Sequence, residues 1–201
     1  MSLEFTAPNK ANLTGLILAG GQGQRFNRQD KGLISFKNTT LIEYVIERLR
    51  PNVNQLLISA NRNLDFYQSL NADCITDAIE NFSGPLAGIH AALKNLQTDW
   101  LISVACDTPY FPADYVERML TTLNESNSLL AIAQSNSQLQ NVFMLAHKNL
   151  FNSLDTFLNK GERKAQIWVE QHQPVIVDFS DIDNAFYNIN TPEDLIELEK
   201  M

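Results

Sequence analysis

The chain has 201 residues, of which 44% are hydrophobic, and this suits one α/β domain with a complete core. Its formal net charge of −8 excludes a broad nucleic-acid-binding surface, because binding to phosphate backbones requires an excess of Lys and Arg, so any anion site must be local. No apolar run approaches the roughly 18 residues of a membrane span and the N-terminal residues lack a signal-peptide pattern, so we expect a cytoplasmic protein with no nucleic-acid or membrane partner.

The first half of the chain alternates short apolar runs with segments of helical periodicity. Residues 1–12 are polar and are expected to form a flexible leader. Apolar residues at positions 41, 42, 45, 46 and 49 form the stripe of an amphipathic helix. Strands are expected at 16–19, 55–60, 74–75 and 100–105, and helices at 41–49, 64–70 and 86–96. This alternation predicts βαβ units and a mainly parallel sheet.

The second half continues the same pattern and ends in a well-marked helix. Helices are expected after residue 112 to about 123, at 149–158 and at 164–171, and strands at 129–133, 142–146 and 174–179. Thr191 is suited to cap the final helix, with Pro192 and acidic residues in its first turn. The chain is therefore predicted to be a single-domain, Rossmann-like three-layer α/β/α fold with a mixed, mainly parallel central sheet.

A glycine-rich loop, AGGQGQRFNRQDKGL at 19–33, follows the first predicted strand. The Walker A pattern fails because Arg25-Phe26 stands where Gly-Lys is required, and the dinucleotide fingerprint meets Phe26 at its third glycine. Glycines after a strand let backbone N–H groups approach ligand oxygens. Arg25 can donate two hydrogen bonds to phosphate, and Lys31 supplies a point charge. The loop therefore predicts a site for an anionic ligand.

The motif LAGGxGxR…DKGL resembles the signature loop of nucleotidyltransferases with a glycosyltransferase-A-like fold. More narrowly, the sequence is similar to the molybdenum cofactor guanylyltransferase (MobA) family. The resemblance extends from residue 15 to about 198. Further motifs recur in order: SANR at 59–62, ITD at 75–77, GPLAG at 84–88, CDTP at 106–109, GERK at 161–164, VDFSD at 177–181 and NINTPEDL at 188–195. Each motif is weak alone, and the ordered set is specific.

The resemblance implies transfer of GMP from GTP to molybdopterin, with Mg²⁺ as cofactor and pyrophosphate as the second product. The nucleophile would be the terminal phosphate of the pterin, already an oxyanion, so no general base is required. Catalysis then depends on bringing two anions together and stabilising their charge. The resemblance further implies a GTP-binding half at 13–110, a molybdopterin-binding half at 111–201, and transient contacts with other molybdenum-cofactor proteins.

The resemblance also assigns roles to individual residues. Arg25, Lys31 and Asp107 are the expected catalytic residues, and Asp107, at the end of the strand 100–105, is the expected magnesium ligand. Ser59 stands where the family often has Asn. The expected nucleotide-binding residues are Leu18, Ala19, Gly20, Gly21, Lys31, Ser59, Asp77, Gly84 and Asp107. The expected molybdopterin-binding residues are Arg163, Lys164, Asn188 and Asn190, the last two spaced to face one side of a strand.

Other functions remain compatible with the sequence. A cytidylyltransferase acting on the same pterin, or an enzyme activating a sugar phosphate, would use the same fold. The resemblance implies guanine rather than cytosine, because cytidylyl relatives tend to have a different residue at the second glycine of Gly20-Gly21 and to lack the GPLAG motif present here at 84–88. A catalytically silent nucleotide-binding regulator is a third reading, and the presence of both Lys31 and Asp107 favours an active enzyme over it.

Overall fold

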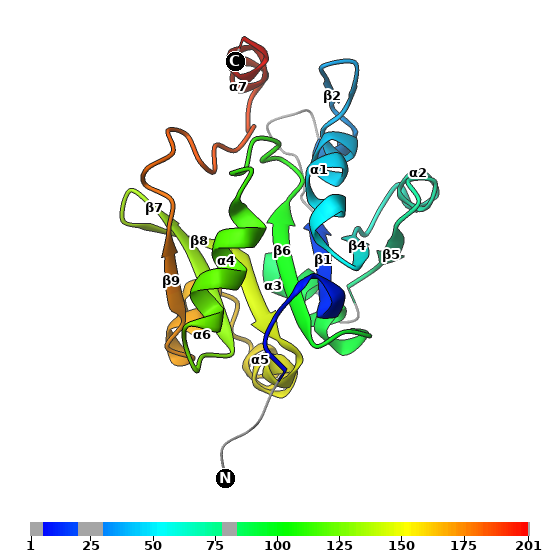
Figure 1. Ribbon diagram of the computed structural model, residues 1–201. Coiled ribbons are helices and arrows are strands. Elements are labelled where there is room, and N and C mark those ends of the chain that lie inside the picture. The colour runs from blue at the N-terminus through cyan, green and yellow to red at the C-terminus, as the bar shows by residue number, and fades with distance from the viewer. Residues whose placement is uncertain (1–5, 20–29, 78–83, 201) are drawn as a thin grey trace.

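A computed structural model describes residues 6–19, 30–77 and 84–200, and its centre is a seven-stranded sheet (Figure 1). The strand order is β5-β4-β1-β6-β8-β7-β9. Strands β1, β4, β5 and β6 are mutually parallel, β8 is antiparallel to its neighbours β6 and β7, and β7 is parallel to β9. The bounds are β1 Leu13–Leu18, β4 Gln55–Ser59, β5 Asp73–Ile75, β6 Trp100–Ala105, β7 Leu130–Ser135, β8 Gln138–His147 and β9 Val175–Asp178. The mixed, mainly parallel sheet confirms the predicted fold class.

Helices cover both faces of this sheet. One face packs against α1 (Leu41–Leu49), α2 (Leu64–Gln68) and α4 (Tyr115–Asn124), and the other against α3 (Pro85–Lys94), α5 (Phe151–Asn159) and α6 (Ala165–Gln171). Successive side chains of a strand point to opposite faces. Trp100 and Ile102 of β6 accordingly belong to the first apolar core, whereas Leu101 belongs to the second. The predicted three-layer α/β/α arrangement is thereby confirmed.

Two helices begin at caps that the local sequence specifies. Thr40 and Glu43 form a reciprocal capping box at the start of α1. Thr191 and Asp194 do the same for α7 (Pro192–Glu199), with Pro192 in the first turn, as expected for the final helix. Because each box satisfies backbone groups that a helix end leaves free, these two starting points are specified locally.

A small hairpin and a third apolar cluster were not anticipated from the sequence. Strands β2 (Ser35–Phe36) and β3 (Thr39–Thr40) are joined by Lys37 and Asn38, whose φ angles are 43° and 69°. Two-residue strands show no periodicity, so pattern reading has nothing to detect. Phe36 packs with Leu198 of α7 in this cluster. The C-terminal helix is thus tied to a segment near the start of the chain.

Several boundaries differ from the prediction. The strand expected at 142–146 is longer, because β7 and β8 form a hairpin that extends it back to residue 138. The helix expected at 149–158 begins as the 3₁₀ turn η5 (Lys148–Leu150) and continues as α5. Other 3₁₀ turns are η1 (Lys10–Asn12), η3 (Lys31–Leu33) and η4 (Arg50–Asn52). In the segment before β1, the carbonyl of Thr6 accepts a hydrogen bond from the indole of Trp100 at 2.8 Å; the flexibility expected there stays a prediction.

Within the three described ranges, no helix combines the length and the apolar character needed to cross a membrane.

Candidate active site

Three segments that are distant in sequence meet around one ammonium group. Lys31, in η3, donates hydrogen bonds from Nζ to Asp107 Oδ2 at 2.8 Å and to Asn190 Oδ1 at 2.8 Å. The side chains of Lys31 and Asp107 are 18% and 19% exposed, so solvent still reaches the pair. A cation held between a carboxylate and an amide, at an accessible position, is suited to receiving phosphate oxygens.

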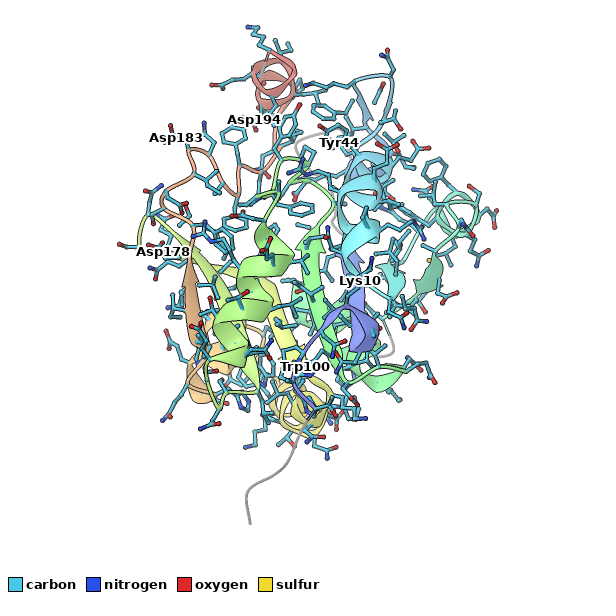
Figure 2. The ribbon with its side chains drawn as sticks, in the orientation of Figure 1. Lys10, Tyr44, Trp100, Asp178, Asp183 and Asp194 are labelled. Atoms are coloured by element: carbon cyan, nitrogen blue, oxygen red, sulfur yellow. The ribbon has the colours of Figure 1, made fainter. Side chains whose placement is uncertain are left out.

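The sheet explains why these residues meet. In the parallel pairing of β1 with β6, Leu18 lies beside Ala105, and the N–H of Cys106 donates to the carbonyl of Leu18 at 3.1 Å. Both strands therefore end at the same edge, and Lys31 and Asp107 follow them in the chain. The carboxyl edge of parallel strands is where ligands bind in open α/β sheets. Figure 2 shows Trp100, the first residue of β6, toward the opposite end of the molecule from Asp194 on α7.

Residues 187–190 do not form a strand, which corrects the expectation that Asn188 and Asn190 share one side of a strand. Contacts with the loop after β6 hold it instead. The N–H of Ile189 donates to the carbonyl of Asp107 at 2.8 Å, and the hydroxyl of Thr108 donates to Asn188 Oδ1. Thr108 was not among the predicted site residues, although it lies inside the CDTP motif that was singled out.

The cap of α7 further fixes the segment that carries Asn190. The backbone N–H groups of Asn190 and Thr191 both donate to Asp194 Oδ2 at 2.8 Å. The hydroxyl of Tyr187 donates to Asp194 Oδ1 at 2.9 Å. The start of a helix thus positions the amide that accepts from Lys31.

Asp77 lies just after β5, near the same edge. Asn61 donates to Asp77 Oδ2 at 2.7 Å and accepts from the N–H of Asp77 at 3.0 Å. The other carboxylate oxygen, Oδ1, is buried and has no hydrogen-bond partner among the described residues. Burial raises the pKa of Asp77, and the hydrogen bond from Asn61 opposes that rise. A buried acceptor without a partner among the described residues is the kind of group that a hydrogen-bond donor would satisfy.

The GPLAG motif forms the start of α3 and its contact with β4. Gly84 precedes the helix with a φ of +141°, a conformation that favours glycine, and Pro85 occupies the first turn. A Cβ on Gly88 would lie 2.6 Å from Ser59 Oγ and 2.7 Å from Leu18 Cδ2. Glycine at 88 therefore lets the helix approach two of the predicted nucleotide-binding residues. In addition, the N–H of Ala19 donates to the carbonyl of Ser59 at 2.9 Å.

Of the remaining predicted residues, some lie between α5 and α6, and others lie outside the residues that the structure describes. Gly20, Gly21 and Arg25 fall outside the described residues. Arg163, between α5 and α6, donates to the carbonyl oxygens of Leu158 at 2.9 Å and Glu162 at 2.6 Å. Lys164 is exposed and precedes α6. The molybdopterin-binding role of this pair stays a prediction.

The cluster formed by Lys31, Asp107 and Asn190 offers a divalent cation one carboxylate, that of Asp107. Within the described ranges, no group of three or more His, Cys, Asp or Glu side chains is arranged to hold a metal ion. Asp107 Oδ1 lies 3.5 Å from the hydroxyl oxygen of Thr108, whose proton goes to Asn188, while Oδ2 pairs with Lys31. This donor set fits Mg²⁺, which keeps several waters and binds through one or two carboxylates together with substrate phosphates.

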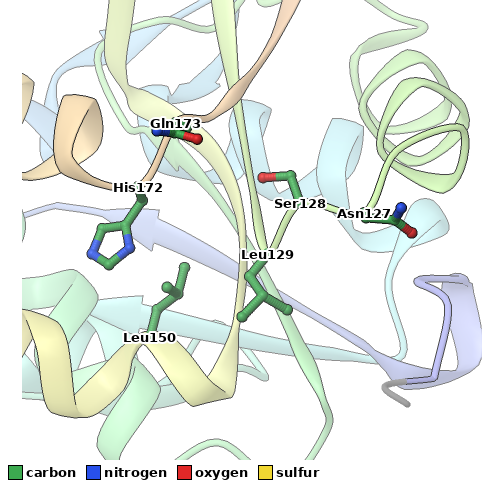
Figure 3. Close-up of a pocket in the computed structure, with 6 residues that line it drawn as sticks. All are labelled: Asn127, Ser128, Leu129, Leu150, His172 and Gln173. Atoms are coloured by element: carbon green, nitrogen blue, oxygen red, sulfur yellow. The ribbon is translucent and has the colours of Figure 1, made fainter. Parts of the chain in front are cut away.

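A pocket of about 390 Å³ lies at the other end of the sheet (Figure 3). Its lining comes from the segments that enter β7 and β9 and from the turn that follows β8. The lining residues are Asn127, Ser128, Leu129, Leu150, His172 and Gln173. The pocket is therefore remote from the carboxyl edge where Lys31 and Asp107 meet.

Comparison with known proteins assigns this chain to a family. Residues 15–175 match the model of the MobA-like NTP transferase domain. The chain is 41% identical to the molybdenum cofactor guanylyltransferase of Shewanella halifaxensis, over 91% of this chain and 92% of that protein.

Two solved structures share the fold. Molybdopterin-guanine dinucleotide biosynthesis protein A from Archaeoglobus fulgidus has a TM-score of 0.77 and 24% identity, covering 93% of this chain and 97% of that one. Rv0371c from Mycobacterium tuberculosis, in complex with manganese, has a TM-score of 0.68 and 14% identity, covering 94% of this chain and 96% of that one. On the strength of the domain match and the sequence identity, the chain belongs to the molybdenum cofactor guanylyltransferase family of MobA-like nucleotidyltransferases.

Proposed function

We propose that this protein transfers GMP from GTP to molybdopterin, giving molybdopterin guanine dinucleotide and pyrophosphate. The observation that carries the proposal is the contact of Lys31 with both Asp107 and Asn190 at the carboxyl edge of the sheet. Family membership supports the reaction class, and this cluster supports an active member of the family over a silent nucleotide-binding regulator.

The reaction is a displacement at the α-phosphorus of GTP. An oxygen of the pterin phosphate forms a bond to that phosphorus, and the bond from phosphorus to the bridging oxygen of the β-phosphate breaks. The electron pair leaves with pyrophosphate. Since the nucleophile is already an anion, the protein needs no proton acceptor, and its task is to hold two anions in line and stabilise their charge.

Lys31 provides fixed positive charge for this task, and Arg25 of the signature loop is proposed to assist it. Lys31 already pairs with Asp107, so phosphate oxygens would enter a site where the ammonium is in place. Asp107, together with substrate phosphates and water, would hold Mg²⁺. When bound, the cation would neutralise phosphate charge.

The GTP-binding half, 13–110, is proposed to contact the nucleotide along the ends of β1, β4 and β5. Leu18, Ala19 and Ser59 lie together there. Asp77 Oδ1, which has no hydrogen-bond partner among the described residues, is proposed to accept N–H groups such as those of guanine. Gly20, Gly21 and Gly84 are proposed to permit close approach of the backbone.

The second half, 111–201, is proposed to bind molybdopterin. Asn190 is held beside Lys31 and Asn188 beside Thr108, so both amides border the position where the two substrates would meet. Arg163 and Lys164 are proposed to contribute positive charge toward the pterin phosphate. A cytoplasmic location and transient contacts with other molybdenum-cofactor proteins complete the proposal.

Pyrophosphate release tests this function. The purified protein is incubated with molybdopterin and Mg²⁺ and with GTP, CTP or ATP in separate reactions. We expect release from GTP that depends on molybdopterin. Release from CTP alone would assign a cytidylyltransferase. Release only in parallel reactions in which a sugar phosphate replaces molybdopterin would assign a different acceptor, and no release with either acceptor would favour a silent regulator.

A further inference from the structure

Asp30, the residue before Lys31, is a buried carboxylate with a full set of hydrogen-bond donors. It is only 3% exposed. Its Oδ1 accepts from the N–H of Gly32 at 3.2 Å and from the hydroxyl of Tyr67 at 2.8 Å. Its Oδ2 accepts from Asn63 Nδ2 at 2.9 Å and lies 3.6 Å from Arg62 Nε. Burying a carboxylate is costly unless it is hydrogen-bonded in this way, so this arrangement is specific.

These contacts join two separate parts of the chain. Asp30 caps η3, the single turn that carries Lys31, through its bond to the N–H of Gly32. Asn63 and Tyr67 belong to the start and the body of α2, which lies beside β5 at the edge of the sheet (Figure 1). Tyr67 is fully buried. Its burial, and to a smaller extent the neighbouring negative charge of Asp30, raise the pKa of its hydroxyl well above the usual range. The phenol therefore remains a proton donor to Asp30.

Gly32 fits tightly against the same phenol. A Cβ at position 32 would lie 2.4 Å from Tyr67 Oη and 3.3 Å from Tyr67 Cζ. Since a separation of 2.4 Å is impossible for these atoms, a side chain at 32 would displace either η3 or the tyrosine. The hydroxyl of Tyr67 thus contacts both the residue before Lys31 and the residue after it.

We propose that Asp30, Asn63 and Tyr67 form a clamp that positions Lys31 for catalysis. The hydrogen bonds of the clamp hold the turn η3 against α2, so that the ammonium of Lys31 reaches Asp107 and Asn190. Helix α2, which supplies no group to the cluster around Lys31, is thereby a determinant of turnover. This inference rests on the proposed function, because it assigns a cause to the position of the lysine that the transfer uses.

The first test removes one hydroxyl. Tyr67→Phe keeps the ring and deletes the donor to Asp30. We expect kcat for GMP transfer to fall by about tenfold, with KM for GTP and for molybdopterin changed by less than about threefold, because misplacing a catalytic group acts mainly on the transition state.

A matched control is available in Tyr115→Phe. Tyr115, in α4, is also fully buried, and its hydroxyl donates to the carbonyl of Ser103 in β6 at 3.0 Å, so this hydrogen bond involves neither η3 nor α2. Both variants lose a buried hydrogen bond, so both should unfold at a somewhat lower temperature, but only Tyr67→Phe should lose turnover. Equal kcat values in the two variants would overturn the clamp.

The second test uses suppression. Gly32→Ala should lower kcat by more than about tenfold, since the new Cβ meets the hydroxyl of Tyr67. In the double variant Gly32→Ala with Tyr67→Phe that hydroxyl is gone, and the nearest ring atom is 3.3 Å away. We expect the double variant to be more active than Gly32→Ala alone, a coupling that additive effects cannot produce. Losses that simply multiply would contradict the proposal.

A chemical readout separates this proposal from the proposed function. Wild-type protein, Tyr67→Phe and Tyr115→Phe are treated with trinitrobenzenesulfonate, and modification of Lys31 is followed by peptide mass spectrometry with the exposed Lys94 as internal reference. Faster modification of Lys31 in Tyr67→Phe, but not in Tyr115→Phe, supports the clamp, even if the wild-type protein does not transfer GMP. Unchanged modification in a protein that does transfer GMP would overturn the clamp and leave the function standing.

Discussion

At the scale of single residues, Lys31 joins the two halves of the chain through two hydrogen bonds. One goes to the carboxylate of Asp107 and the other to the amide of Asn190. The ammonium is thus oriented before any substrate arrives. An oriented charge needs little rearrangement in the transition state, and this is where electrostatic catalysis gains most.

Loss of either charge should therefore lower turnover strongly. We expect Lys31→Met and Asp107→Asn each to lower kcat by at least about a hundredfold, as removal of an electrostatic stabiliser usually does. Steady-state pyrophosphate release gives the values. Lys94→Met and Asp183→Asn, which change the same charges at exposed positions elsewhere, should keep wild-type kcat. Near-normal turnover in Lys31→Met or Asp107→Asn would remove that residue from the site.

At the scale of elements, the N-terminal cap of α1 supports the turn that carries Lys31, since α1 packs against η3. Hydrogen bonds from the hydroxyls of Thr40 and Thr39 and from the N–H of Thr40 lower the pKa of Glu43 below its ordinary value of 4.5. Because the pKa is lower in the folded state, the charged carboxylate of Glu43 stabilises the fold at pH values above its ordinary pKa. That contribution is lost as the pH falls through the folded-state pKa.

Glu43→Gln should reveal this dependence. We expect the variant to be less stable than wild type at neutral pH, and the difference in unfolding free energy to shrink as the pH falls from about 6 to about 3. Urea unfolding at several pH values gives the difference. In a Thr40→Ala background, which lacks the largest cause of the shift, the same substitution should show a weaker pH dependence. A difference that grows toward acid pH would contradict the assignment.

The contact between α3 and β4 gives a second prediction at this scale. Gly88→Ala places a methyl group within 2.7 Å of both Ser59 Oγ and Leu18 Cδ2. We expect a loss of about 1–3 kcal/mol in unfolding free energy, the usual result of overpacking a core. Ser59→Gly combined with Gly88→Ala should recover part of the loss, because one of the two contacts is removed. Wild-type stability of the single variant would show that the helix shifts without cost.

Local patterns explain which elements were predictable. Helix α1 and strand β6 were predicted with their observed bounds, because an amphipathic stripe and an unbroken apolar run are contained in the segment itself. The β2–β3 hairpin was missed because its strands have two residues each. Asp107 and Lys31 could be named from motifs. Asn63 and Tyr67 could not, because their role depends on a carboxylate more than 30 positions away in the chain.

At the scale of the whole molecule, the site lies where the C-terminal segment returns to the first half of the chain. Helix α7 packs on a third apolar cluster with Phe36 and Ile34, and the residues just before it reach the loop after β6. Figure 1 shows α7 at the same end of the sheet as the β2–β3 hairpin. The proposed GTP-binding and molybdopterin-binding halves therefore meet at one edge, which is the geometry that transfer between two bound substrates requires.

The most direct test of this account follows the nucleotidyl group itself. The protein is incubated with molybdopterin, Mg²⁺ and GTP labelled at either the α- or the γ-phosphorus, and the pterin product is isolated and counted. The account predicts label in a guanine dinucleotide from α-labelled GTP and none from γ-labelled GTP, with transfer nearly abolished in Asp107→Asn. Label that reaches the pterin only from CTP, or equally well in Asp107→Asn, would contradict it.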